Sequence, residues 1–277
     1  MVFPQIAAFA RLANGAEIPK RVIAGQPTKL SRAMHDIQYD EMHDEMIIAN
    51  PFAQAILTYR GGANGEEPPI RVLQGPHTQM VSPDFGVEVD PIHDEIFVAE
   101  TDSILVFPRT ANGDAAPIRV LGGPNAQLNG EARALSVDPV NNLLVVSSEV
   151  NHHGQILIFN RTDAGDVKPR AVIAGPATGI RAHINHLRVY GPKGWIVTTI
   201  GGGGDGESSE EQEEGRSRGN SIAVWSIHDK GDIPPRWLLG GAKSAVRGAR
   251  IALNRKAKEV VIGGGATIRT WYFPEIF

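Results

Sequence analysis

Histidine, carboxylate and arginine side chains gather at two kinds of position in this sequence, just before and just after short apolar segments. Imidazole and carboxylate groups act as general acids and bases, and both also bind divalent metals. Arginine can bind an anion or stabilise a negatively charged oxygen during a reaction. The candidate catalytic residues are His35, Glu100, Arg133, Glu149, His183, His186 and Arg250.

The first chemistry that this set could perform is metal-assisted. A divalent metal (Ca²⁺, Mg²⁺, Mn²⁺ or Zn²⁺) would hold a water molecule as nucleophile or base, with His35, His183, His186 and Glu149 as ligands and Glu100 as an alternative carboxylate. His183 and His186 would face opposite sides of a regular strand, because they are an odd number of residues apart. They converge only if His183 lies in the loop before the strand.

Two other interpretations stay open. In one, histidine and carboxylate side chains work as acid and base without a metal, and Arg133 and Arg250 bind an anionic group or stabilise an enolate. In the other, the same side chains have no catalytic role and are only solvated and ion-paired. If they surround the mouth of a channel, they must be polar simply to be solvated. The sequence alone does not separate these interpretations.

Several functional classes are excluded by what the sequence lacks. The run from Gly201 to Gly206 has glycines at the spacing of a dinucleotide motif, but no strand and helix pattern surrounds it, so we expect no nucleotide or flavin site. A Walker loop and a serine-hydrolase elbow are also missing. The net charge of −4 and the pI of 6.1 give no electrostatic sign of a nucleic-acid or membrane partner.

The remaining totals favour a soluble protein. No apolar run reaches the roughly 18 residues of a membrane span, and the first residues lack the pattern of a signal peptide. The sequence has no Cys, which excludes disulfides and Cys-ligated zinc. We expect a cytoplasmic protein, or a secreted one whose signal has been removed, and find no indication of its oligomeric state.

A repeated sequence pattern predicts the strands that must position these residues. An Asn-Gly or similar turn is followed by Pro, then by a short apolar strand that ends in Gly at positions 25, 75, 123, 175 and 241. Three more apolar segments lie between successive glycines, so each repeat of roughly 50 residues predicts four strands. The last repeat is longer because it contains the Gly-, Ser- and Glu-rich tract 201–219, which we predict to be a long exposed loop.

The repeat predicts an all-β fold, a β-propeller of four-stranded antiparallel blades that occupies residues 1–277 as a single domain. Five blades are favoured and six are the alternative. We expect closure by pairing of the N- and C-terminal strands. The segments 6–11 and 267–272 both have the pattern of a third strand, so one of them is surplus.

Polar residues that recur at the same place in several repeats are predicted to be structural, because every blade has the same packing problem. His43 and His93 occupy the same acidic turn in successive repeats. Asn14, Asn64 and Asn112 likewise occupy the same Asn-Gly turn. His152 and His153 are predicted to lie in a solvent-facing loop.

The chain resembles the NHL-type propellers and the gluconolactonase- and streptogramin-lyase-like propellers. The resemblance rests on the turns Val89-Asp90-Pro91 and Val137-Asp138-Pro139 and on the strand Glu95–Ala99. It implies a small-molecule hydrolase or lyase with its site at the mouth of the central channel. No family metal ligand carries over onto a matching residue, and the alternative is a non-enzymatic binding platform for a protein or a glycan.

Overall fold

The computed structural model describes residues 4–32, 34, 36–83, 86–128, 132–181, 184–201, 221–241, 244, 246, 250–264 and 267–277. These residues form short β-strands, joined by turns and by single turns of 3-10 helix. The described part contains no helix with the length and apolar character needed to cross a membrane. The chain divides into two compact units, each described by itself: Met1–Glu100 with Leu105–Arg119, and Thr101–Ile104 with Val120–Phe277.

The first unit contains a two-stranded sheet and a four-stranded sheet. The two-stranded sheet pairs β1 (Gln5–Ala8) with β2 (Arg21–Ala24). The four-stranded sheet has the order β3 (Ile37–Asp40), β4 (Glu45–Asn50), β5 (Ala55–Arg60), β6 (Arg71–Gln74).

The boundary between the units runs through the next sheet, and the remaining sheets lie in the second unit. The sheet at the boundary has the order β7 (Gly86–Asp90), β8 (Glu95–Ala99), β9 (Ser103–Pro108), β10 (Arg119–Gly122). The next has the order β11 (Leu135–Asp138), β12 (Leu143–Val150), β13 (His153–Asn160), β14 (Ala171–Ile173). The last two contain β15 (Leu187–Tyr190), β16 (Trp195–Ile200), β17 (Ser221–Ser226), β18 (Trp237–Leu239), and then β19 (Arg250–Asn254), β20 (Glu259–Gly264), β21 (Thr267–Tyr272).

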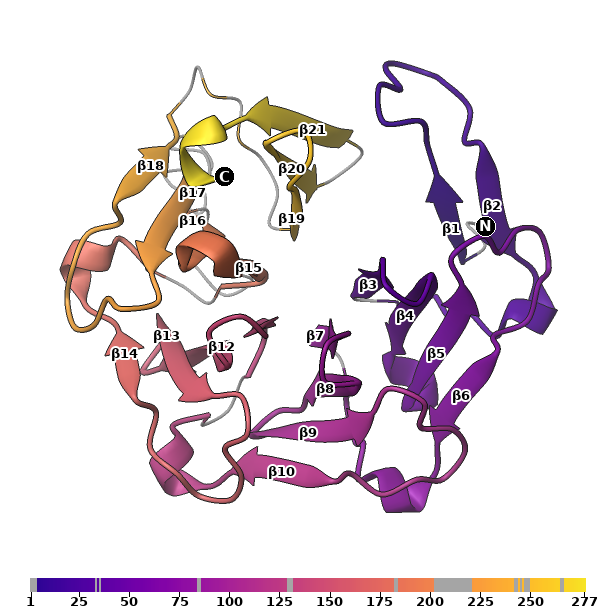
Figure 1. Cartoon of the computed structure of the whole chain (residues 1–277), viewed down its shortest axis with the longest axis horizontal. Coiled ribbons are helices and arrows are strands. Elements are labelled where there is room, and N and C mark those ends of the chain that lie inside the picture. The colour runs from indigo at the N-terminus through magenta and orange to yellow at the C-terminus, as the bar shows by residue number, and fades with distance from the viewer. Residues whose placement is uncertain are drawn as a thin grey trace. The chain divides into compact units, whose positions relative to one another are not determined.

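The predicted all-β fold is confirmed: the blades are antiparallel sheets with their strands in chain order, and the fold is a five-bladed β-propeller. Figure 1 shows this order for β7, β8, β9 and β10. In the repeat, β19, β20 and β21 occupy the positions of the first, second and third strands of a blade. β2 occupies the position of a fourth strand, and β1 comes before it in the position of a third. Both segments with a third-strand pattern therefore form strands, as β1 and β21.

Two further expectations are not tested by these sheets. Pairing between the N- and C-terminal strands would join the two units, so it stays a prediction, as does a single domain over 1–277. The predicted loop 201–219 lies outside the described residues after its first residue.

The second strands β4, β8, β12 and β16 are buried on both faces, as their continuous apolar runs predict, whereas in β20 only Val260 and Ile262 are buried. All five residues of β8 are buried, and in β4 the residues Ile47, Ile48 and Ala49 are no more than 1% exposed. The core of the first unit gathers around Ile48, Leu57 and Tyr59. Because these second strands cannot move without opening the core, the residues at their ends are held in a fixed position.

The Asn-Gly turns bind the fourth strand of the preceding sheet. Val22 N donates to Asn64 Oδ1 at 3.0 Å, and Gly65 N donates to Val22 O at 2.7 Å. Gly65 has a φ of 66°, which favours glycine because a side chain is strained there. We call these turns, together with the corresponding turns at Ala164-Gly165 and Lys230-Gly231, the latch turns. Their glycines pair with the fourth strands as Ile23↔Gly65, Leu73↔Gly113, Leu121↔Gly165 and Ile173↔Gly231.

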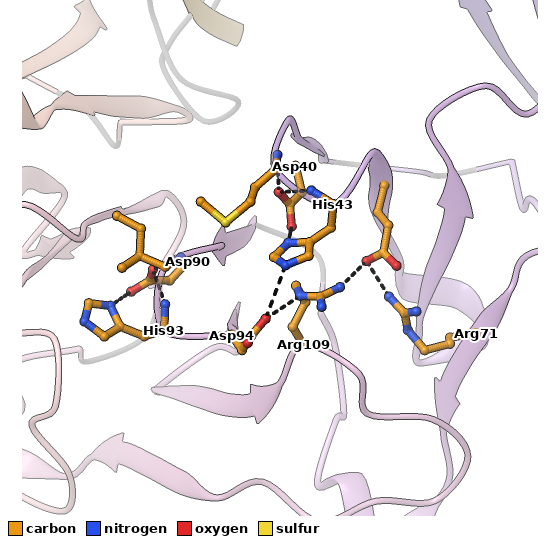
Figure 2. A network of polar contacts seen from close by, with 10 residues as sticks. Asp40, His43, Arg71, Asp90, His93, Asp94 and Arg109 are labelled. Carbon is orange, nitrogen blue, oxygen red and sulfur yellow. Dashed lines mark hydrogen bonds and ion pairs between the residues drawn. The ribbon is translucent and has the colours of Figure 1, made fainter.

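An Asp at the end of the first strand organises the turn to the second strand. Asp40 Oδ1 accepts hydrogen bonds from Met42 N and His43 N, and its Oδ2 lies 2.7 Å from His43 Nδ1. Asp90 and His93 repeat this arrangement, also at 2.7 Å (Figure 2). The repetition supports the structural role predicted for both histidines.

Candidate functional site

A side chain just before the first strand supports the first strand of the next sheet. A first strand lies at the edge of its sheet, so some of its N–H groups lack a partner within the sheet and need an acceptor elsewhere. Asp36 Oδ2 accepts from Val87 N at 3.2 Å, and His186 Nδ1 accepts from Ile251 N at 3.0 Å. Asp36 and His186 hold the same repeat position and are 8% and 5% exposed. Each one connects two neighbouring sheets.

This contact defines the chemical state of His186. A ring nitrogen that accepts a hydrogen bond carries no proton, so the bond to Ile251 N assigns a neutral imidazole with its proton on Nε2. The backbone oxygen of His186 also accepts from Thr198 Oγ1 at 2.6 Å. His186 is therefore held on two sides. Its predicted catalytic and metal-binding roles remain predictions.

Glu100 fastens a loop to the end of a second strand. Its Oε2 accepts hydrogen bonds from Val81 N at 3.2 Å and Ser82 N at 2.8 Å, and the residue is 4% exposed. Asn50 and Ser148 occupy the same repeat position and also hold the loop that leads to the first strand of their own sheet. This recurrence gives Glu100 a structural role; its predicted catalytic role is untested.

Ser147 joins the entries of two first strands in the second unit. Its Oγ accepts from Ala134 N at 2.9 Å and donates to Ile184 O at 2.9 Å. Arg133 N donates to Ser147 O at 3.2 Å. The structure thus brings the backbone at Arg133, the end of β12 and the segment before β15 together around one buried hydroxyl.

The hairpin of β12 and β13 is longer than the corresponding hairpins of the other described sheets. Both strands have eight residues, whereas β4 and β5 have six. The added pairs are Glu149↔Gly154 and Val150↔His153. Asn151 and His152 form the two-residue turn with φ of 51° and 63°. Positive φ at both positions is the geometry of a tight hairpin turn, and it is unusual for His.

The lengthened hairpin places a carboxylate beside an imidazole. Glu149 Oε1 lies 3.4 Å from His152 Nδ1, with the Glu149 side chain 19% exposed and that of His152 fully exposed. A carboxylate at this nitrogen can orient a neutral histidine as a base or stabilise its protonated form. The solvent-facing position of His152 was predicted from the sequence, but its pairing with Glu149 was not.

The remaining candidate residues are Arg250, Arg133, His35 and His183. Arg250 is the exposed first residue of β19, and within the described residues its side chain contacts no other candidate. The side chain of Arg133 is at an intermediate level of burial. His35 and His183 lie outside the described residues.

The described residues do not by themselves make a metal site. No group of three or more His, Asp or Glu side chains converges anywhere in the described part of the chain. Of the four predicted ligands, only Glu149 and His186 are described, and catalytic zinc sites use three protein ligands. A divalent metal therefore stays a prediction that depends on His35 and His183.

Comparisons with known proteins reveal the fold and not the family. No protein-family model and no curated protein sequence matches the chain. Similar solved structures are hydrazine synthase of Kuenenia stuttgartiensis (9% identity, TM-score 0.57, 84% of this chain and 56% of that one) and the WD40 domain of Toxoplasma gondii coronin (11%, 0.51, 88% and 56%). A third is a nidogen/laminin complex (14%, 0.58, 93% and 84%). This chain thus spans little more than half the length of the first two, and the three include an enzyme and a protein bound to another protein.

Proposed function

We propose that the protein is a small-molecule hydrolase or lyase of the lactonase and streptogramin-lyase kind, and that Glu149 and His152 are its acid–base pair. The observation that carries the proposal is the 3.4 Å contact between Glu149 Oε1 and His152 Nδ1 on the lengthened hairpin. The hairpin breaks the repeat at the end of the blade where the first strands begin. A structural need common to all blades does not explain it.

The chemistry follows from the orientation of the imidazole. With Nδ1 held by Glu149, the Nε2 of His152 is the atom that would take a proton from water or from a carbon next to a carbonyl group. Arg133 and Arg250 are the candidates for stabilising the negative oxygen that forms. No step is assigned to a metal, because the described residues do not form a site for one.

A second function, a non-enzymatic binding platform for a protein or glycan, is favoured by the exposure of the same hairpin. Val150 at its tip is 41% exposed, and His152 is fully exposed. An exposed apolar residue next to polar ones can serve as a contact surface. In this case Glu149 would only stiffen the hairpin.

The two functions are separated by three variants assayed on lactones and cyclic esters. We expect Glu149→Gln and His152→Gln to reduce kcat/KM by about 10²- to 10⁴-fold, the usual contribution of an acid–base group. His153→Gln is the matched control, because His153 is exposed on the same hairpin and pairs only through its backbone. Equal turnover by all three variants would exclude the proposed pair. Loss of a binding partner on Val150→Asp, without any turnover, would indicate the platform.

A further inference from the structure

An aspartate directly follows the glycine in three of the four latch turns, and its carboxylate holds the turn of 3-10 helix that comes after the preceding fourth strand. Oδ1 of each aspartate accepts from one backbone N–H of that turn at 2.6 Å, in the pairs His77–Asp114, Asn125–Asp166 and Ala177–Asp232. We call these three contacts the carboxylate clamps.

The carboxylate clamps explain three of the glycines that close the fourth strands. A Cβ atom on Gly75 would lie 2.4 Å from Cγ of Asp114, well inside the van der Waals distance. Gly123 and Gly175 are crowded in the same way by the other two clamp carboxylates. The clamps are therefore fitted closely to the backbone that they hold.

The side chain at the clamped position differs among the three carboxylate clamps. His77 Nδ1 lies 2.6 Å from Asp114 Oδ2. Asn125 Nδ2 donates to Asp166 Oδ2 at 2.8 Å, whereas Ala177 has no polar side chain. The three side chains are thus ionisable, polar and neutral, and apolar, and of the three only the imidazole can gain a charge between pH 5 and 8.

The His77–Asp114 clamp is open to solvent and carries one permanent charge. The side chains of His77 and Asp114 are 76% and 36% exposed, so the imidazole can exchange protons with water. Burial acts against ionisation of the carboxyl group, but the hydrogen bonds from His77 outweigh it and hold the pKa of Asp114 below its ordinary value. Asp114 is therefore ionised throughout the pH range in which histidine titrates.

This clamp holds one end of a loop that a candidate residue holds at the other end. The loop begins at Gly75, continues through η3 (Pro76–Thr78) and reaches Ser82. Glu100 accepts from the backbone N–H groups at Val81 and Ser82, as described above. The state of the clamp at His77 therefore bears on how often the whole loop opens.

We propose that His77 makes its clamp sensitive to pH, so that the loop 75–82 is held more firmly at mildly acidic pH than at neutral pH. Protonated His77 adds the attraction of opposite charges to the hydrogen bond that the neutral ring also makes with Asp114. The gain is present in full below the pKa of about 6.5 that a free histidine has, and it is lost as the pH rises through that range. An exposed pair is weak, so the opening constant changes by about two- to fivefold.

Amide hydrogen exchange of the full chain, followed by NMR, measures the opening of all three carboxylate clamps in one sample. After correction for the intrinsic exchange rates, we expect the protection factor of the amide at His77 to rise by about two- to fivefold between about pH 7.5 and about pH 5.5. The protection factors of the amides at Asn125 and Ala177 should stay constant. No change at His77, or equal changes at all three amides, would overturn the proposal.

His77→Asn provides the matched control, because it introduces the side chain that the clamp at Asn125 already has. The clamp carboxylate keeps its partners in this variant, but no group in the clamp gains a charge in this pH range. The protection factor of the amide at position 77 should then no longer depend on pH. A pH dependence that survives in His77→Asn would contradict the proposal, since another group would be its cause.

Discussion

At the scale of single residues, Arg109 joins the turns of two neighbouring sheets in the first unit (Figure 2). Its Nε donates to Asp94 Oδ1 at 2.7 Å, and its Nη1 donates to Glu45 Oε2 at 2.8 Å. Glu45 also accepts from Arg71, while His43 Nε2 lies 3.8 Å from Asp94 Oδ1. The hydrogen bond from Arg109 lowers the pKa of Asp94 below its ordinary value.

The lowered pKa of Asp94 predicts a pH-dependent contribution to stability. Ionised Asp94 stabilises the fold fully above the pKa of 3.8 that a free Asp has, and this contribution is lost as the pH falls through the lower folded-state pKa. We expect Asp94→Asn to be less stable than the wild type at neutral pH, with the difference shrinking below about pH 4. Urea unfolding at several pH values measures it. A difference that is constant with pH would contradict the proposed ion pair.

At the scale of elements, the latch turns explain why the sequence pattern that contains the Asn-Gly turn recurs in successive repeats. Each fourth strand has one partner in its own sheet, and its other edge would be open. The latch turn of the next sheet fills this edge with hydrogen bonds to Asn64 and Gly65, or to Asn112 and Gly113. Asn14 has the same sequence context, and within the first unit it holds no strand.

Alanine at two Asn positions separates the latch from the turn itself. We expect Asn64→Ala to lower the free energy of unfolding by about 0.5–1.5 kcal/mol, because it removes the acceptor for Val22 N. Asn14→Ala is the matched control and should change it by less than about 0.5 kcal/mol. Chemical denaturation of both variants gives the comparison. Equal losses would show that Asn serves the turn and not the latch.

At the scale of the whole molecule, the sequence predicted the fold more completely than the candidate site. The repeat could be recognised because the glycines at 25, 75, 123, 175 and 241 and the apolar second strands answer the same packing need in each blade. The lengthened β12–β13 hairpin was missed because its added residues extend past the core and contain a single apolar side chain, Val150, so no apolar alternation marks a strand. The acceptor role of His186 was missed for another reason: it depends on an N–H of another sheet.

The two kinds of candidate residue lead to different expectations for stability. His186 is buried and serves as the acceptor for Ile251 N, so it belongs to the fold whatever else it does. Glu149 lies on the added part of the β12–β13 hairpin and contacts an exposed imidazole, so we expect its removal to leave the core unchanged. The residues at the strand ends therefore divide into two groups, one that supports the fold and one that is available for chemistry.

Urea unfolding of His186→Phe beside Glu149→Gln tests this division most directly. We predict that His186→Phe loses about 1–3 kcal/mol, since it leaves Ile251 N buried without its acceptor. Glu149→Gln should stay within about 0.5 kcal/mol of the wild type. A stable His186→Phe together with a destabilised Glu149→Gln would contradict the account, because Glu149 would then support the fold and His186 would be available for chemistry.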